Sequence, residues 1–184
     1  MKTSYQCIKK QKYTIQDFSL VPIRWEDRYK IMQWRNKQKF HLHQDKELTV
    51  EDQDAYFENI ISNLFDQDKP KQILISLLKD NRYIEYEVLV HINWIDKNVE
   101  ISFIMGTKHE NKFFNMNWLK FIELIENLGF NKLKFKKLYV YAFELRPHLY
   151  KVLGKSNYFL EARLKSHCKI KNTYKDVVIY SKIK

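Results

Sequence analysis

The chain has 184 residues, of which 45% are hydrophobic and 15% aromatic, and its formal net charge is +11. This length predicts one domain over residues 1–184, with residues 1–16 as an N-terminal extension. The apolar content excludes intrinsic disorder. No apolar run reaches the length of a membrane span, and residues 1–16 lack the apolar core of a secretory signal, so we expect neither.

The positive charge can be interpreted in two ways. Lys and Arg bind the phosphates of nucleic acids, but the lysines here are scattered singly along the sequence. This scatter favours a generally Lys-rich composition over a nucleic-acid partner, and a basic chain also suits a small polyanion such as a nucleotide cofactor. Cys7 and Cys168 lack metal-ligand spacing, so we expect reduced thiols in the cytoplasm, with a disulfide as the alternative.

Hydrophobic periodicity and turn signals predict that the first half of the chain contains one strand, two helices and then three strands. Their ranges, in chain order, are 17–24, 26–37, 50–65, 72–79, 83–94 and 99–105. Thr49 can cap the second helix, and Asp52 lies where a capping box requires an acidic residue.

In the second half, a loop over 109–115 leads into an amphipathic helix that Gly129 is expected to close as a C-terminal cap. A strand, a short helix and two strands follow at 137–143, 146–154, 158–170 and 174–183. Meandering strands followed by a β-α-β unit predict an α/β fold of the mixed-sheet (α+β) kind. About seven mostly antiparallel strands would carry helices on both faces.

This order resembles the GCN5-related N-acetyltransferase (GNAT) fold. "IRWED" at 23–27 and "WRN" at 34–36 are similar to the opening of the branches that acetylate amino sugars and protein N-termini. "VEISFIM" at 99–105 is similar to the central strand of the family, and the segment from 145 to 183 is similar to its ending.

The resemblance implies acetyl-CoA as co-substrate and acetyl transfer to a small-molecule amine, with an amino sugar or nucleotide-linked amino sugar as the expected acceptor. A protein N-terminus is an alternative acceptor. A second alternative is a binding protein that kept the GNAT scaffold and lost the coenzyme site. We leave a homodimer open.

The coenzyme loop of the family usually carries glycines, and the matching stretch "NKFFNMN" at 111–117 has none. Asparagine tolerates positive φ better than most residues, and every residue except proline offers an amide. We therefore expect the loop to bind a pyrophosphate without glycine. The coenzyme-binding residues that the resemblance implies are Phe103, Ile104 and Met105 for pantetheine, and Asn111, Lys112, Phe113, Phe114 and Asn115 for the phosphates. Arg146 is expected to hold the coenzyme or a phosphorylated acceptor, and a helix-start residue in solvent is the alternative.

Glu100 is the expected general base, because acetyl transfer needs a neutral amine and Glu100 lies on an inner strand. The alternative is a surface charge beside a turn. Tyr150, on the short helix where the family often places a tyrosine near the thioester, is the expected acid. A packed aromatic side chain is the alternative.

Polar and aromatic side chains that follow the first strand are expected to form the acceptor wall, together with a histidine of a middle strand. These residues are Trp34, Arg35, Asn36, His43, Gln44 and His91. A metal trio of His41, His43 and His91 is the weaker interpretation, because no carboxylate or Cys joins it at ligand spacing. We therefore expect no metal.

Overall fold

The structure is a computed structural model that describes residues 2–39, 42, 44–105, 107–145 and 147–184. The description of residues 85, 87, 105, 107–114, 147 and 148 is limited to the backbone.

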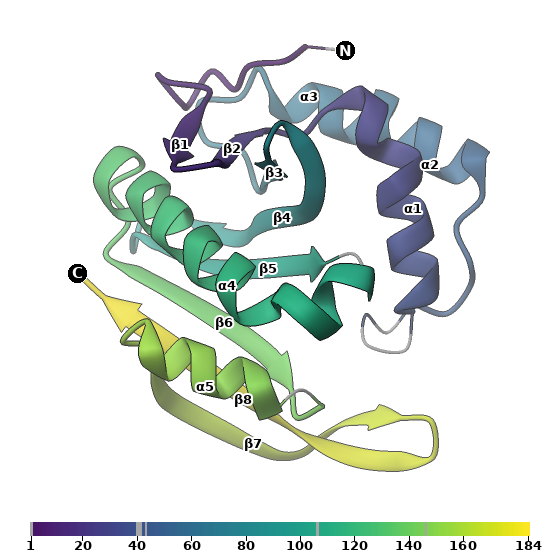
Figure 1. The fold of residues 1–184 in the computed structure, drawn as a ribbon, viewed down its shortest axis with the longest axis vertical. Helices are drawn as coiled ribbons and strands as arrows, with labels where there is room; N and C mark the ends of the chain where they lie inside the picture. Colours follow the sequence, from purple (N-terminus) through teal and green to yellow (C-terminus); the bar gives the residue numbers. More distant parts are fainter. Residues whose placement is uncertain (1, 40–41, 43, 106, 146) are drawn as a thin grey trace.

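Within the described residues, eight strands form one sheet in the order β1-β2-β3-β4-β5-β6-β8-β7 (Figure 1). All neighbouring strands are antiparallel except β5 and β6, which are parallel. The predicted mixed, mostly antiparallel sheet is therefore confirmed, with one strand more than expected. The strands are β1 (Tyr13–Ile15), β2 (Phe18–Pro22), β3 (Ile73–Lys79), β4 (Arg82–Asn93), β5 (Asn98–Met105), β6 (Lys137–Phe143), β7 (Phe159–Ile170) and β8 (Thr173–Ile183).

The helices follow the predicted order. A π-helical turn interrupts the second helix, another follows α4, and the first helix begins with a 3-10 turn. They are η1 (Trp25–Asp27), α1 (Arg28–Lys37), α2 (Val50–Tyr56), η2 (Phe57–Ile61), α3 (Ser62–Leu64), α4 (Thr107–Glu126), η3 (Asn127–Lys132) and α5 (Pro147–Lys155). The capping box is confirmed: the amide of Asp52 donates to Thr49 Oγ1 and the amide of Thr49 donates to Asp52 Oδ2, each at 3.1 Å.

Both faces of the sheet are covered at β3. Residues 73–78 of β3 are all buried, and since successive side chains of a strand point to opposite faces, this requires packing on each side. Figure 1 shows α4 and α5 in front of the sheet and α1–α3 grouped at the β1–β4 end. α4 packs directly on β5, where the ring centroids of Phe103 and Trp118 lie 4.0 Å apart.

Residues 1–16, which the sequence suggested as an extension, are partly integrated into the fold. They contribute β1, and Tyr5 is 1% exposed. The ring of Tyr5 stacks on Phe65, and its hydroxyl accepts a hydrogen bond from the amide of Leu74 at 2.9 Å and lies 3.2 Å from the Leu74 carbonyl oxygen. This segment therefore completes the edge of β3 beyond the end of β2.

Two local predictions were wrong. Gly129 does not close the helix in a left-handed conformation: it is buried inside η3, and a Cβ there would lie 2.9 Å from Leu138 Cδ2. Close packing on β6 thus explains this glycine. The expected loop over 109–115 is instead helical, because α4 already begins at Thr107.

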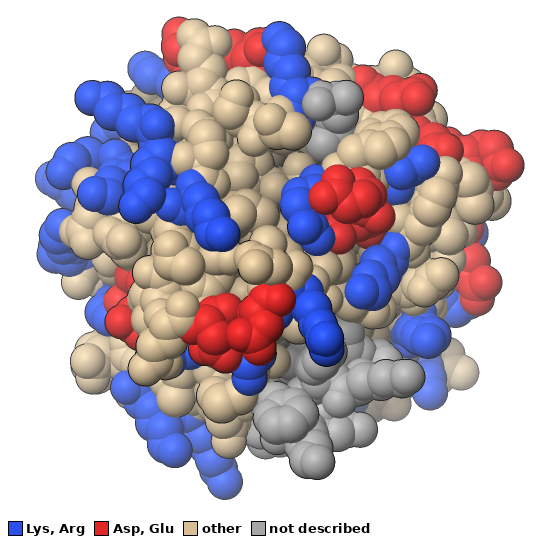
Figure 2. All heavy atoms as spheres, turned by 45° about the horizontal axis from the view of Figure 1, so that its top comes forward, with Lys and Arg blue, Asp and Glu red and all other residues tan. Residues whose placement is uncertain are grey.

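Both signs of charge are present on the face shown in Figure 2. Figure 2 shows Asp and Glu side chains between the Lys and Arg side chains on the view it presents. Cys7 and Cys168 are both free thiols, and burial raises the pKa of Cys7 to about 11. Of the helices described, none has the length and apolar content needed to cross a membrane.

The Tyr5 hydroxyl predicts a measurable stability effect. Tyr5→Phe should lower the free energy of unfolding by about 1–3 kcal/mol, because the buried Leu74 amide loses its partner. Urea denaturation monitored by tryptophan fluorescence measures this change. Tyr174→Phe is the matched control, since Tyr174 is 63% exposed. Equal midpoints for both variants would show that the Tyr5 hydroxyl contributes nothing.

Candidate active site

The central feature of the site is a fork between two parallel strands. β5 and β6 are paired only at Asn98–Lys137, Val99–Leu138 and Glu100–Tyr139. β5 then continues to Met105 and β6 to Phe143 without further pairing to one another among the residues described. Beyond Glu100, the edge of β5 that faces β6 is therefore not hydrogen-bonded to that strand among the described residues.

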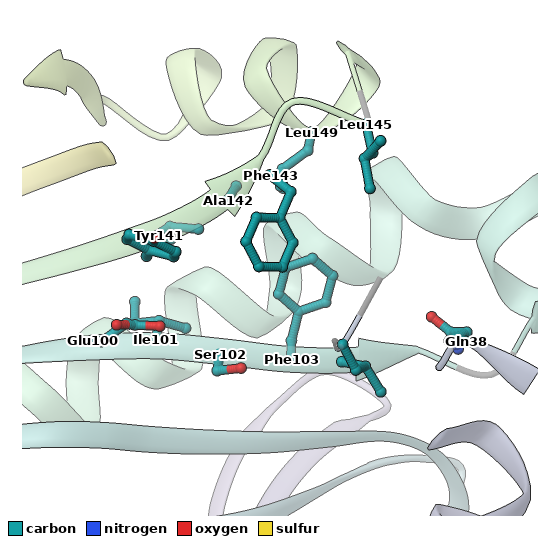
Figure 3. Close-up of a pocket in the computed structure, with 12 residues that line it drawn as sticks. Gln38, Glu100, Ile101, Ser102, Phe103, Tyr141, Ala142, Phe143, Leu145 and Leu149 are labelled. Carbon is teal, nitrogen blue, oxygen red and sulfur yellow. The ribbon is translucent and has the colours of Figure 1, made fainter. Parts of the chain in front are cut away.

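A cavity of about 220 Å³ lies in this fork. Figure 3 shows Phe103 from β5 and Phe143 from β6 extending into the space between the strands, with Gln38 of the segment after α1 at one end. Most of the lining is apolar, and Glu100 and Ser102 supply polar atoms. The lining residues are Gln38, Leu42, Glu100, Ile101, Ser102, Phe103, Val140, Tyr141, Ala142, Phe143, Leu145 and Leu149.

A second, larger cavity of about 530 Å³ opens on the sheet face opposite α4. Glu100 and Tyr139 lie opposite each other in the register and share this face, whereas Ile101 and Phe103 point toward α4. Glu100 and Tyr141 line both cavities and so join them. The residues around the second cavity are His91, Asn98, Glu100, Lys137, Tyr139, Tyr141, Glu161, Ala162 and Ile179.

Glu100 forms a close pair with His91. The distance from His91 Nδ1 to Glu100 Oε2 is 2.9 Å, and the side chains are 74% and 12% exposed respectively. Burial raises the pKa of Glu100, and the hydrogen bond and charge of His91 oppose this rise without cancelling it. The structure thus brings together Glu100 and His91, two residues that the sequence analysis selected for different roles.

Tyr139 and Tyr141 were missed by the sequence analysis. Burial raises the pKa of each hydroxyl, and the nearby Glu100 carboxylate raises it further, so both hydroxyls remain protonated at neutral pH. Their i, i+2 spacing in "LYVYAF" indicated that they share one face of a strand. Nothing in the sequence indicated that this strand lies beside Glu100.

Tyr150 is not brought into either cavity. Its hydroxyl donates to the Phe143 carbonyl oxygen at 3.3 Å, and its ring stacks on Tyr180 at 5.5 Å between centroids. Burial, as the main cause, raises its pKa to about 12. The helix α5 instead presents Leu149 to the cavity in the fork, so the packed-aromatic alternative describes Tyr150 better.

Three residues of the expected acceptor wall, Trp34, Asn36 and Gln44, make contacts within the fold and line neither cavity. Trp34 stacks on Tyr83 at 4.9 Å. The Asn36 side chain bonds the amide and the carbonyl oxygen of Leu48, each at 2.9 Å, and accepts from Gln44 at 2.8 Å, which braces the α1–α2 connection. Arg35 is in neither set of lining residues.

From this region, Gln38 and Leu42 reach the cavity instead. His41 and His43 lie outside the described residues, and so does the metal trio that would include them. Helical spacing alone did not distinguish Gln38 from its neighbours.

The start of α4 changes which amides could bind phosphate. In an α-helix only the first-turn amides lack an intrahelical acceptor, so those of residues 107–109 are available and those of 111–117 are not. Asn115 is exposed. The side chains of Asn111, Lys112, Phe113 and Phe114, and all of Arg146, lie outside the description. Phe103, Ile104 and Met105 are the last residues of β5, beyond the fork point.

Comparisons with known proteins give a clear result for the fold. No protein-family model matches the chain, and no curated protein matches it. Among solved structures, a spermidine N-acetyltransferase from Vibrio cholerae in complex with CoA and spermine has 16% identity and a TM-score of 0.79, covering 92% of this chain and 96% of that one. A probable acetyltransferase has 15% identity and a TM-score of 0.75, covering 94% and 97%.

A dodecameric structure of the Vibrio cholerae spermidine N-acetyltransferase has 18% identity and a TM-score of 0.73, covering 92% of this chain and 95% of that one. The chain therefore has the GNAT acetyltransferase fold, which confirms the fold that the motifs had indicated.

The raised pKa of Glu100 predicts a pH-dependent stability difference. A carboxyl whose folded pKa is raised stabilises the fold only while it is protonated, so its contribution is lost as the pH rises from the ordinary value of 4.5 through the folded pKa. Glu100→Gln cannot ionise. The melting temperature of the variant relative to wild type should therefore increase from about pH 4 to about pH 7. A constant difference across thermal melts would contradict the assignment.

Proposed function

We propose that the protein is an acetyl-CoA-dependent N-acetyltransferase that acts on a small polar amine. The observation that carries this proposal is the fork: two parallel strands separate at the position where a buried carboxylate, Glu100, joins a cavity between the strands to a cavity on the opposite face. The two substrates of acetyl transfer can approach such a carboxylate from opposite sides.

The residues of the fork fit the coenzyme. The backbone of β5 beyond Glu100, which β6 does not pair, offers amide and carbonyl groups for the pantetheine arm, whose own amides require such partners. The apolar lining from Phe103, Val140 and Leu149 suits the methylene segments between those amides. The first-turn amides of α4 are the donors that a pyrophosphate needs, because a helix N-terminus favours anions.

Glu100 supplies the base. As the bond between the amine nitrogen and the thioester carbonyl carbon forms, the nitrogen loses a proton to the Glu100 carboxylate. The carbon–sulfur bond breaks, and the sulfur leaves with the electron pair as the coenzyme thiolate. A base in this position must be ionised when the amine arrives, which is why its pKa controls the rate.

Tyr141 supplies a hydrogen-bond donor at the fork, in place of Tyr150. It lines both cavities beside Glu100 (Figure 3), and its raised pKa keeps the hydroxyl protonated. A protonated hydroxyl can stabilise negative charge that develops on the thioester oxygen or on the departing sulfur.

For the acceptor we propose an amine on a hydroxyl-rich carrier, with an amino sugar or a nucleotide-linked amino sugar as the leading class. Asn98, Tyr139 and Tyr141 offer hydrogen bonds and aromatic surface in the second cavity. Of its two carboxylates, Glu161 is already bound by Lys137 at 2.5 Å. A polyamine such as the spermine in the Vibrio cholerae complex would require more unpaired carboxylates than the cavity offers.

The first test is coenzyme binding and turnover. Calorimetric titration should show that wild type and Glu100→Gln bind acetyl-CoA with similar affinity. The variant should lose about two orders of magnitude in kcat, the usual effect of removing a general base. Absence of acetyl-CoA binding by wild type would favour the alternative of a GNAT scaffold without a coenzyme site. Unchanged turnover in the variant would remove Glu100 from the mechanism.

A pair of tyrosine variants tests which hydroxyl acts in the fork. Tyr141→Phe should lower kcat about tenfold or more, because a donor to the developing charge is lost. Tyr150→Phe is the matched control and should retain most of the wild-type kcat, since its hydroxyl already bonds a backbone carbonyl. The reverse order of effects would reinstate Tyr150 as the acid. Steady-state assays of released thiol measure both.

A panel of acceptors tests the proposed class. Glucosamine, a nucleotide-linked amino sugar, spermidine and a short peptide with a free N-terminus should be compared at equal acetyl-CoA concentration. The proposal expects the highest kcat/KM with one of the two amino sugars. Preference for spermidine or for the peptide would replace the acceptor class and leave acetyl transfer in place.

A further inference from the structure

The His91–Glu100 contact depends on an irregularity of the sheet. The pairing of β4 with β5 is regular up to Val90–Glu100 and resumes at Asn93–Asn98, so His91 and Ile92 oppose the single residue Val99. This is a β-bulge. In a regular strand, His91 would point to the face opposite to that of Val90 and Glu100. The bulge turns its ring back to the Glu100 side, 2.9 Å from the carboxylate.

The backbone of His91 is unfavourable for a residue with a side chain, and packing does not explain it. His91 has a φ of 48°, in the left-handed region. Its side chain is 74% exposed, so burial of the ring offers little compensation. The specific interaction that this conformation secures is the hydrogen bond to Glu100. Residues held in unfavourable backbone conformations cluster at active sites and ligand clamps.

The contact also bears on the ionisation of Glu100. Burial favours the protonated carboxyl, and the His91 hydrogen bond favours the carboxylate. Tyr139 and Tyr141 face Glu100 from β6, and their hydroxyls stay protonated. Lys137 of β6 and Glu161 of β7 line the same cavity but bind one another. Among the described residues, His91 is therefore the side chain that lies within hydrogen-bond distance of the Glu100 carboxylate and can donate an N–H to it.

We propose that His91 is a positioning residue for Glu100. An N–H at Nδ1 donates to Oε2 and fixes the carboxylate, so that Oε1 is left to take the proton of the acceptor amine. The same bond keeps Glu100 ionised at a pH where its burial alone would promote protonation. This inference rests on the proposed acetyl transfer for its kinetic consequence, but the hydrogen bond itself can be tested without any activity.

Two substitutions separate the effect of the His91–Glu100 hydrogen bond from the effect of the left-handed backbone at position 91. His91→Gly removes the ring and suits a left-handed backbone, so the variant should fold. His91→Asn also tolerates this backbone and returns an N–H donor near the place of Nδ1. Asp80→Gly is the matched control, since Asp80 is exposed, has the same φ of 48° and lies in neither cavity lining.

The first measurement follows the Glu100 carboxyl carbon by carbon-13 NMR over pH, with Glu100→Gln to assign the signal. The pKa of Glu100 should rise in His91→Gly, because a donor to the carboxylate is lost. It should return toward the wild-type value in His91→Asn and stay unchanged in Asp80→Gly. An unchanged Glu100 pKa in His91→Gly would overturn the positioning role, whether or not the protein is an enzyme.

The second measurement is the pH profile of kcat/KM. His91→Gly should lower kcat about tenfold or more, move the acid limb to higher pH and leave the affinity for acetyl-CoA unchanged. Added imidazole, or the Asn substitution, should restore part of the rate. If His91→Gly keeps the wild-type pH profile, the positioning role is rejected and the proposed acetyl transfer is not. An inactive wild type that fails to bind acetyl-CoA would instead reject the proposed function. The NMR titration would still show whether the His91 hydrogen bond affects the pKa of Glu100.

Discussion

The separation of β5 from β6 is the constraint on which the site depends. Parallel strands are held together by evenly spaced hydrogen bonds, and here three paired positions keep the strands in register before they diverge. The three paired positions of β5 and β6 fix where the fork begins. Beyond them, the strands separate, and backbone groups that would be hydrogen-bonded in a continuous sheet are not paired between these two strands. The helices α4 and α5, in front of the sheet (Figure 1), close the apolar side of the opening.

Glu100 lies at the last paired position, and this placement produces two opposing effects. The sheet buries the carboxylate and so favours its protonated form, whereas the general base that we propose must be ionised. The bulge in β4 opposes the first effect by directing His91 at one carboxylate oxygen. The bulge in β4 therefore affects the ionisation of Glu100, because it places His91 within hydrogen-bond distance of the carboxylate.

Local sequence signals located most of the elements. Thr49 and Asp52 form the capping box that their spacing indicated, and the polar turns at 80–82 and 96–98 separated three strands correctly. The signals failed where tertiary packing overrides local preference. Gly129 suggested a helix cap, yet it is buried because β6 passes too close for a Cβ. The polar residues after Gly106 suggested a loop, yet α4 begins at Thr107.

The sequence by itself determined the order of the elements and the mixed sheet, because periodicity, capping residues and turn residues act over a few positions. It also proposed Glu100 as a candidate base. It also selected His91, but as part of a binding wall. Only the tertiary structure decided which residues meet. Tyr141 and Glu100 are distant in the chain and close in space because β5 pairs with β6 at Glu100–Tyr139, two residues before Tyr141. Tyr150, chosen from its local motif, packs against Tyr180 instead.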